Sequence, residues 1–215
     1  MITDRQKRAF VAACHRAAGD YGLMRCSSGN MSWRVDARRM LVTATRTWLA
    51  DIRTNQVAIV RLIDGTVLNH CKPSVESDFH AGVLRARPDR DVVLHFQTPF
   101  ATTLACSAVA SARFNVIPEI PYYIGPIAVV PYLPPGSAEL AQGVIRALTR
   151  HDLAVLRNHG QVVVGQTFDD TIQKAVFFEL ACEIIVRAGA GLRPLPKAAT
   201  ASLLRHQHGK SRAGP

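Results

Sequence analysis

Five stretches of the chain repeat apolar residues at the three- and four-residue spacing of an amphipathic helix. Before residues 4–21, Thr3 with Gln6 forms a capping box. Pro99 suits the first turn of a later helix, and Ser137 suits the cap of another. The sequence therefore predicts helices at residues 4–21, 74–85, 137–150 and 168–188, with a further helix that begins at residues 98–99.

Short apolar or alternating runs between turn residues predict strands. Asp64-Gly65 separates two of these runs and suits the type I′ turn of a β-hairpin. Helices are interspersed among the strands without a regular βαβ order, which is typical of helices packed around a mostly antiparallel sheet. The expected strands are residues 31–35, 39–45, 57–63, 66–69, 92–95, 127–132, 153–156 and 161–164.

We predict one α/β domain over residues 1–190, with three α/β/α layers and a mostly antiparallel central sheet. Apolar residues make up 48% of the chain and charged residues 20%, the balance of an ordinary globular protein. Residues 191–215 are rich in Pro, Gly, Lys and Arg, and we expect this basic tail to be flexible.

The chain carries 26 Lys and Arg against 16 Asp and Glu, a formal net charge of +10. Half of this excess lies in the tail, and the other basic residues are scattered without interleaved aromatic residues. This distribution argues against a nucleic-acid partner. A basic protein attracts small phosphorylated metabolites equally well.

Two further features bear on the cellular compartment. No apolar run reaches the roughly 18–20 residues of a membrane span, and the polar N-terminus lacks the apolar region of a secretory signal. We therefore expect no membrane partner and a cytoplasmic location. The five cysteines form no C-x-x-C pair, so we expect reduced, mostly buried thiols rather than disulfides or a thiolate zinc site.

Two histidines and one glutamate stand at the ends of separate predicted elements. His95 ends the strand at 92–95, His159 lies in the turn at 158–160, and Glu76 begins a helix. Each has a simple explanation when taken alone: a core histidine forms hydrogen bonds, and an acid in a first turn is favoured by the helix dipole. Together they could hold a divalent metal beside a carbonyl substrate.

The order and spacing of five motifs resemble the class II aldolase/adducin family, and within it the fuculose-1-phosphate aldolases. The resemblance runs from about residue 5 to residue 188. The motifs are SGNMSWR at residues 28–34, LVTAT at 41–45, KPSVE at 72–76 with His80, VVLH at 92–95, and NHG at 158–160 with Gly165.

The resemblance implies a divalent metal, with zinc as the first choice, held by His95, Gln97 and His159. Residues i and i+2 of a strand share one face, so a single strand supplies two ligands. The family has a second histidine where this chain has Gln97, and an amide is a poorer zinc ligand than an imidazole. Either Gln97 coordinates weakly, or Glu76 or water completes the site, or the metal is a harder ion. His80 is a local alternative, although we expect it to form structural hydrogen bonds.

The resemblance also implies a phosphate site, because backbone N–H groups at glycine-rich turns and helix starts suit an anion. Two positions depart from the family pattern. Arg46 stands where glycine is frequent, and Val75 stands where a second phosphate-binding serine is common. Arg46 either adds an anion contact or blocks the original one. The expected phosphate-binding residues are Ser28, Gly29, Asn30, Thr45 and Ser74.

Glu76 and Tyr122 are the catalytic residues that the resemblance implies. Glu76 would move the proton at the reacting carbon, as a general acid and base. Tyr122 matches a tyrosine that relatives commonly supply from a neighbouring subunit, although an aromatic position in a core or interface explains it equally well. The resemblance therefore implies a homotetramer with active sites at subunit contacts.

The activity that the resemblance implies is that of a metal-dependent aldolase. Such an enzyme cleaves a ketose phosphate, for example fuculose 1-phosphate, to dihydroxyacetone phosphate and a small aldehyde through a metal-stabilised enediolate. Two alternatives remain open. The same scaffold supports sugar-phosphate epimerases and decarboxylases, and adducin-type relatives keep it as a non-catalytic assembly module.

Overall fold

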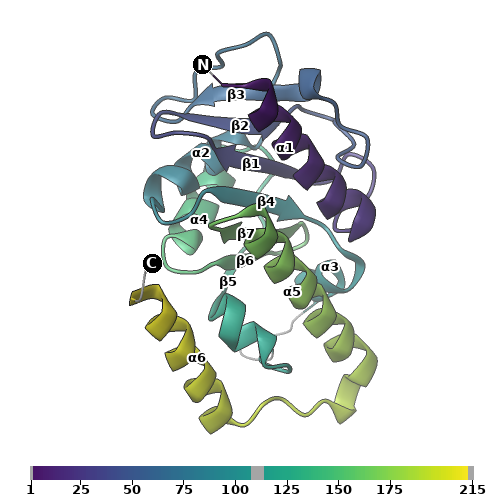
Figure 1. The fold of residues 1–215 in the computed structure, drawn as a ribbon. Helices are drawn as coiled ribbons and strands as arrows, with labels where there is room; N and C mark the ends of the chain where they lie inside the picture. Colours follow the sequence, from purple (N-terminus) through teal and green to yellow (C-terminus); the bar gives the residue numbers. More distant parts are fainter. Residues whose placement is uncertain (1, 108–113, 213–215) are drawn as a thin grey trace.

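A seven-stranded sheet forms the centre of the computed structural model, which describes residues 2–107 and 114–212 (Figure 1). The strands are β1 Asn30–Arg34, β2 Arg39–Thr43, β3 Val57–Arg61, β4 Val92–Phe96, β5 Ile127–Val130, β6 Leu153–Leu156 and β7 Gly160–Gly165. They follow the order β3-β2-β1-β4-β7-β6-β5, and every neighbouring pair is antiparallel except β5 with β6. The predicted α/β fold with a mostly antiparallel sheet is confirmed.

Helices cover both faces of the sheet. They are α1 Asp4–His15, α2 Ser77–Ala86, α3 Pro99–Ala105, α4 Ala138–Leu148 and α5 Phe168–Ala188. Leu94 and Phe96 of β4 enter the core that α1, α3 and α5 complete, whereas Val93 enters the core beneath α2 and α4. Figure 1 shows α1 and α5 in front of the sheet and α2 and α4 behind it. The three-layer arrangement is therefore as predicted.

The helix caps follow the sequence signals. The Thr3 and Gln6 side chains form the reciprocal capping box, and the Ser137 hydroxyl accepts from the Leu140 backbone N–H. The first helix is shorter than predicted, because the chain continues from α1 as a π-helical turn. Short helical turns lie at η1 Arg16–Asp20, η2 Thr54–Gln56, η4 Ile120–Ile124 and η5 Gly189–Gly191.

The predicted hairpin at residues 57–69 is wrong beyond β3. Residues 66–69 form only an isolated bridge, between Val67 and Val60. The Asn69 side chain takes the place of a paired strand, since its oxygen accepts from the Ile59 backbone N–H and its nitrogen donates to the Val57 carbonyl. The turn is also not type I′, which needs a positive φ at both central residues. Of Asp64 and Gly65, only Gly65 has a positive φ, of 74°.

Lys197–Arg212 form helix α6, an element that the sequence pattern did not predict in the basic tail, and the flexibility of the tail stays a prediction. This helix contacts η4, and the Leu195 backbone N–H donates to the Asn115 carbonyl just before it. The Ala and Leu residues at positions 198–204 are strong helix formers, and their propensity outweighs the basic and Pro-rich composition around them.

The cysteines are all free thiols, but they are not mostly buried as predicted. Only Cys14 and Cys182 are buried, whereas Cys26 and Cys106 are exposed. Burial raises the pKa of the Cys182 thiol well above its ordinary value, and the nearby Glu179 raises it further. The two buried thiols therefore behave as core residues.

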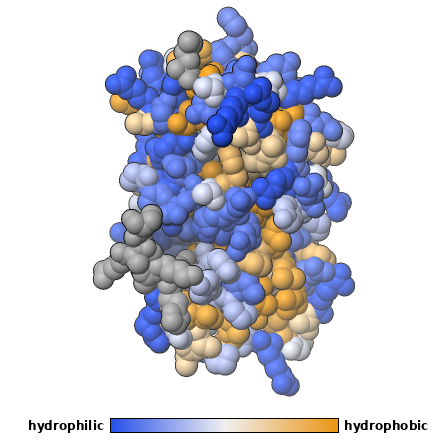
Figure 2. All heavy atoms as spheres, in the orientation of Figure 1, coloured by the Kyte–Doolittle hydropathy of each residue, from blue (hydrophilic) through white to orange (hydrophobic). Residues whose placement is uncertain are grey.

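The surface shows both polar and apolar regions (Figure 2). On the face drawn there, apolar atoms gather over the region of α5, where Leu180 and Val186 are exposed. Within residues 2–107 and 114–212, no helix is long and apolar enough to cross a bilayer.

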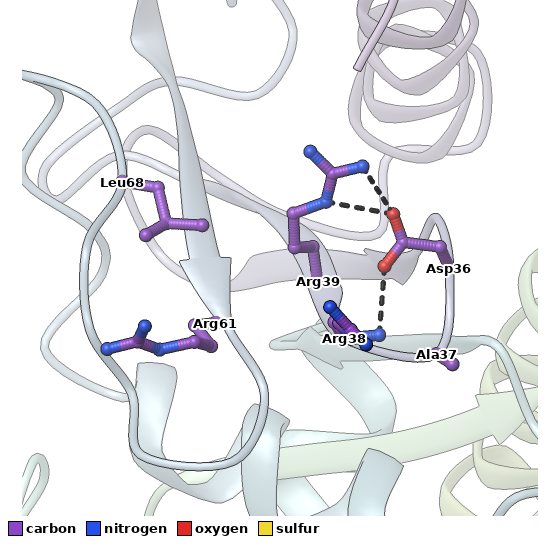
Figure 3. A pocket seen from close by; sticks show the side chains of 6 residues that line it. All are labelled: Asp36, Ala37, Arg38, Arg39, Arg61 and Leu68. Atoms are coloured by element: carbon purple, nitrogen blue, oxygen red, sulfur yellow. Dashed lines mark hydrogen bonds and ion pairs between the residues drawn. The ribbon is translucent and has the colours of Figure 1, made fainter. Parts of the chain in front are cut away.

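A hollow of about 500 Å³ lies beside β2 and β3 (Figure 3). Its arginines include Arg39, which binds the Asp36 carboxylate through two nitrogen atoms, and Arg61, which binds Asp64 in the same way. These ion pairs compensate two of the three arginines that line the hollow and leave the Arg38 guanidinium without an ion pair among the described residues.

A buried ionic cluster joins the sheet to the helices on both faces. The Asp152 carboxylate, next to the start of β6, accepts hydrogen bonds from Arg87, Arg90 and Lys174 at 2.8–3.3 Å. Burial by itself would raise the pKa of Asp152, but the three cations hold this pKa below its ordinary value. The negative charge of Asp152 therefore compensates the positive charges of the three side chains that are buried around it.

We expect Asp152→Asn to lower the free energy of unfolding by about 3 kcal/mol, since removal of one partner leaves buried charges uncompensated. Urea unfolding measures this effect. The matched control is Asp169→Asn, which breaks the exposed pair between Asp169 and Arg16 and should cost less than about 1 kcal/mol. Equal effects of the two substitutions would contradict the structural role of the cluster.

Candidate active site

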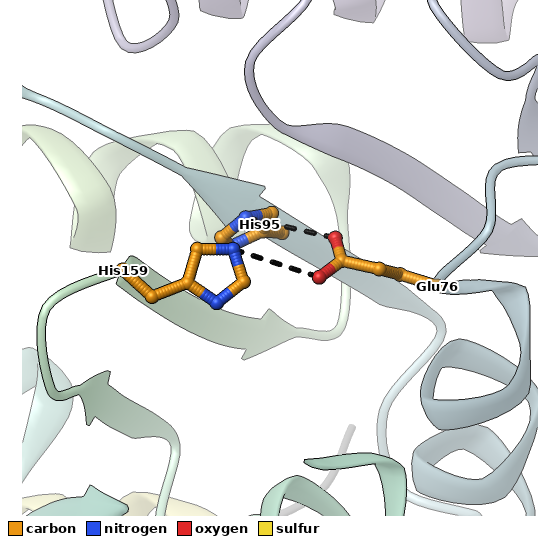
Figure 4. A group of neighbouring side chains, drawn as sticks. All are labelled: Glu76, His95 and His159. Carbon is orange, nitrogen blue, oxygen red and sulfur yellow. Dashed lines mark ion pairs between the residues drawn. The ribbon is translucent and has the colours of Figure 1, made fainter. Parts of the chain in front are cut away.

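Glu76, His95 and His159 come together from three separate elements (Figure 4). Glu76 immediately precedes α2, His95 lies in β4, and His159 lies in the turn between β6 and β7. The Nε2 atoms of His95 and His159 are each 3.6 Å from one oxygen of the Glu76 carboxylate. The candidate ligand atoms of the three residues all lie within 4.8 Å of one another. This cluster is called the trio below.

The hydrogen bonding of His95 fixes its tautomer. Its Nδ1 atom lies 2.9 Å from the backbone carbonyl oxygen of Gln161, and a carbonyl only accepts. Nδ1 therefore carries a hydrogen, and Nε2 is the ring nitrogen that lies near Glu76. A metal-binding histidine commonly donates its other ring N–H in this way.

His159 is a neutral imidazole in this environment. Its burial, with a contribution from His95, lowers its pKa to about 4, although the Glu76 carboxylate acts in the opposite direction. The His159 Nδ1 atom and the Glu76 Oε1 atom are buried, and neither has a hydrogen-bond partner among the described residues. Buried polar atoms without partners are uncommon and call for an explanation.

A divalent metal would explain the unpartnered Glu76 Oε1 atom, because the Nε2 atoms of both histidines and the Glu76 carboxylate lie close to the same point. Two imidazole nitrogens and a carboxylate oxygen are ligands that zinc and related divalent ions accept. The trio thus fits a metal site, and Glu76 belongs to it together with the predicted ligands His95 and His159. A fourth position would remain for substrate, water or Gln97.

Asn30 positions Glu76 through a chain of buried hydrogen bonds. The Asn30 amide nitrogen donates to Glu76 Oε2 at 2.8 Å, so the amide oxygen faces His80 and accepts from its Nε2. His80 Nδ1 in turn accepts from the Ser32 hydroxyl at 2.7 Å. Burial, together with His95, lowers the pKa of His80 to about 3, in agreement with this neutral tautomer. The expected structural hydrogen bonding of His80 is confirmed.

Two glycines permit the close packing around the trio. A Cβ atom on Gly160 would lie 2.7 Å from Gln97 Cγ and 3.0 Å from His95 Cε1. A Cβ atom on Gly29 would lie 2.5 Å from the His95 carbonyl oxygen, and Gly29 also has a φ of 85°. The backbone at Gly29 and at Gly160 therefore lies so close to His95 that a side chain at either position would clash.

The expected phosphate-binding residues lie on segments that meet at this edge of the sheet. The Thr45 backbone N–H donates to the Lys72 carbonyl, and the Ser74 N–H donates to the Thr43 carbonyl. Arg46 has a φ of 59°, the left-handed conformation that accounts for glycine at this position in the family. The Asn30 side chain, however, is engaged by Glu76 and His80, and the Ser28 hydroxyl bonds to the Arg25 backbone. Phosphate binding by these residues stays a prediction.

Tyr122 lies in η4, an element that contacts α5 and α6. Its ring meets the Tyr123 ring edge-on, with the centroids 4.7 Å apart. Tyr122 is not one of the residues that the trio gathers. Its catalytic role also stays a prediction.

Sequence reasoning missed the part that Gln161 plays. Its carbonyl holds His95, and its fully buried side-chain amide has no hydrogen-bond partner among the described residues. The available signal was a polar residue in an otherwise apolar strand, two positions after His159. A polar residue in a strand pattern does not reveal that its backbone carbonyl accepts a hydrogen bond from His95.

Comparisons with known proteins bear on the family and the fold. The family model of the Class II Aldolase and Adducin N-terminal domain matches residues 8–186. A 3-oxo-tetronate 4-phosphate decarboxylase from Pectobacterium atrosepticum is 31% identical over 169 residues, 77% of each chain. A 5-methylthioribulose-1-phosphate/5-deoxyribulose-1-phosphate aldolase from Rhodospirillum rubrum is 30% identical over 75% of this chain and 72% of the relative. An L-fuculose 1-phosphate aldolase structure superposes with a TM-score of 0.84 at 21% identity, over 95% of this chain and 97% of the other.

We expect His159→Ala to lose bound metal while the protein remains folded, because one of three ligands is removed from the trio. Elemental mass spectrometry of protein purified without chelator measures the metal, and circular dichroism measures the fold. His151→Ala is the matched control, since His151 bonds only to the Ala147 carbonyl within its own helix end. Full metal content in His159→Ala would contradict the assignment of the trio.

Proposed function

Because the chain belongs to the class II aldolase and adducin family, we propose that it is a metal-dependent lyase acting on a phosphorylated sugar derivative. It would break a carbon–carbon bond next to a carbonyl group. The observation that carries this proposal is the trio, with the His95 tautomer set by Gln161 so that Nε2 is free to bind a cation. A purely structural module has no need for two imidazoles that face a buried carboxylate.

Glu76, His95 and His159 would hold the cation, with zinc as the first choice. When bound, the metal supplies Lewis acidity that stabilises negative charge developing on the substrate oxygens. The donor set favours zinc over magnesium or calcium, because two of its three members are imidazoles.

Glu76 would also carry the proton. Asn30 occupies Oε2, which leaves Oε1 without a hydrogen-bond donor and able to accept a proton. When the bond breaks, the electron pair stays on the carbon next to the carbonyl and is delocalised onto the carbonyl oxygen. Protonation of that carbon by the Glu76 carboxyl then completes the product.

Two reactions share this chemistry and differ in the group that leaves. In aldol cleavage of a ketose phosphate such as fuculose 1-phosphate, the hydroxyl next to the breaking bond gives its proton to Glu76 and its carbon leaves as part of an aldehyde, with dihydroxyacetone phosphate as the other product. In decarboxylation of a 3-oxo sugar acid phosphate, the carboxylate leaves as carbon dioxide, and Glu76 takes from solvent the proton that it delivers. The names of the relatives support both reactions, and the Pectobacterium relative favours the second. An epimerase would need to rejoin the fragments, and no feature of the described site favours that.

The remaining parts of the proposal concern the substrate phosphate and the assembly. Ser28, Gly29, Asn30, Thr45 and Ser74 would bind the phosphate, with the Thr45 and Ser74 hydroxyl groups as donors, because the backbone N–H groups of Ser28, Thr45 and Ser74 already donate to carbonyls. Tyr122 lies in η4 and does not belong to the trio of its own chain. It would therefore act at the site of a second copy of the chain in a homotetramer. The exposed apolar side chains on α5 offer surface for such an assembly.

We expect protein purified without chelator to turn over fuculose 1-phosphate or a 3-oxo-tetronate 4-phosphate, measured as release of dihydroxyacetone phosphate or of carbon dioxide. Glu76→Gln should reduce the rate by about 100-fold or more, the usual contribution of a positioned general base. Glu139→Gln is the matched control, because Glu139 is exposed on α4.

Metal content is measured on the same samples, which separates loss of the proton carrier from loss of the metal. No turnover of either substrate by metal-loaded protein would favour the adducin-type module instead. Full activity in Glu76→Gln would refute only the role of Glu76.

A further inference from the structure

A second hollow, of about 860 Å³, opens beside the trio. It lies between the loop at residues 25–28 and the start of α3. Its walls are mainly apolar and carry one cation, an amide and several hydroxyl groups. The residues that matter here are Arg25, Gln97, Thr98 and Thr102, whereas Ser28 also lines the hollow but belongs to the loop proposed for the phosphate.

Gln97 connects this hollow to the trio. It follows His95 by two residues, and its Cγ atom and His95 Cε1 both pack against Gly160, the residue after His159. On the other side, Ser28 precedes Gly29, whose backbone lies against the His95 carbonyl. Gln97 thus lies between the trio and the hollow, and a substrate that occupied both would pass this side chain.

Arg25 gives the hollow an uncompensated positive charge. Its backbone N–H and carbonyl bond to the Ser28 hydroxyl, but its guanidinium forms no ion pair or hydrogen bond with any described residue. Arg39 and Arg61 in the hollow of Figure 3 differ in this respect, because each has its own aspartate. Arg25 is thus free to bind an anion from solution.

The other charged groups nearby do not compensate Arg25. The Glu179 carboxylate accepts from the Thr98 hydroxyl and from two backbone N–H groups of α3, so its bonding capacity is used within the protein. The Arg157 guanidinium donates to the Ser107 carbonyl and adds a second cation at the edge. The Thr102 hydroxyl oxygen is buried without a hydrogen-bond partner among the described residues.

We propose that this hollow binds a carboxylate of the substrate, with Arg25 as the charged contact, so that the protein selects a sugar acid phosphate over a neutral ketose phosphate. This inference rests on the proposed function, because it assumes that a phosphorylated sugar derivative occupies the trio. A guanidinium binds a carboxylate through charge-assisted hydrogen bonds, which are about twice as strong as neutral ones. The hydroxyl groups of the wall suit the hydroxyl groups of such a substrate.

Arg25 should act on binding rather than on the chemical step. Its guanidinium stabilises the carboxylate before the bond breaks, and this stabilisation is lost when neutral carbon dioxide forms. An interaction that favours the bound substrate over the transition state lowers KM without raising kcat. Arg25 is therefore a residue that determines specificity.

The test uses two probes that lack a carbonyl group and cannot be cleaved: 4-phosphoerythronate, which carries a carboxylate, and erythritol 4-phosphate, which carries a hydroxymethyl group in its place. Isothermal titration calorimetry measures their affinities for protein purified without chelator. We expect wild-type protein to bind the acid about 10- to 100-fold more tightly. Arg25→Gln should remove this preference and leave the affinity for erythritol 4-phosphate unchanged, and Arg25→Lys should keep part of it.

Arg146→Gln is the matched control, because Arg146 is exposed on α4, away from the hollow, and should keep the full preference. A preference that persists in Arg25→Gln, or equal affinities in wild-type protein, would overturn the carboxylate site alone. If wild-type protein bound neither probe, the sugar phosphate site of the proposed function would fail together with this inference.

Discussion

The buried carboxylate of Glu76 is the constraint on which the candidate site depends. A buried charge is costly unless it is paired and hydrogen-bonded. Asn30 satisfies one carboxylate oxygen, whereas the other faces His159 and has no hydrogen-bond donor among the described residues. The His159 imidazole that faces the carboxylate is neutral because burial lowers its pKa, and His95 turns its Nε2 atom toward the same carboxylate. A cation bound between the three residues would balance this arrangement.

The register of the sheet places the groups that the carboxylate needs. Asn30 of β1 is directly paired with His95 of β4, so one strand pairing positions both the residue that holds Glu76 and a metal ligand. A shift by a single residue would turn both side chains to the opposite face of the sheet. The β4–β7 pairing brings Gln161 beside β4, and the close approach at Gly29 and Gly160 completes the site.

The sequence predicted much of this because its signals are local. The strand that carries His95 and the turn that carries His159 follow from apolar runs and turn residues, and the family motifs name the trio. What failed depends on tertiary contacts. Asn69 replaces a strand through its side chain. The link from Asn30 to Glu76 joins residues 46 positions apart, which no spacing rule reveals.

Anomalous X-ray diffraction tests the central claim most directly, on crystals of protein purified without chelator and with data recorded on both sides of the metal absorption edge. The account predicts one anomalous peak about 2.0–2.2 Å from the Nε2 atoms of His95 and His159 and from an oxygen of Glu76. Protein that contains stoichiometric metal but shows its peak elsewhere, with the trio unliganded, would contradict the account.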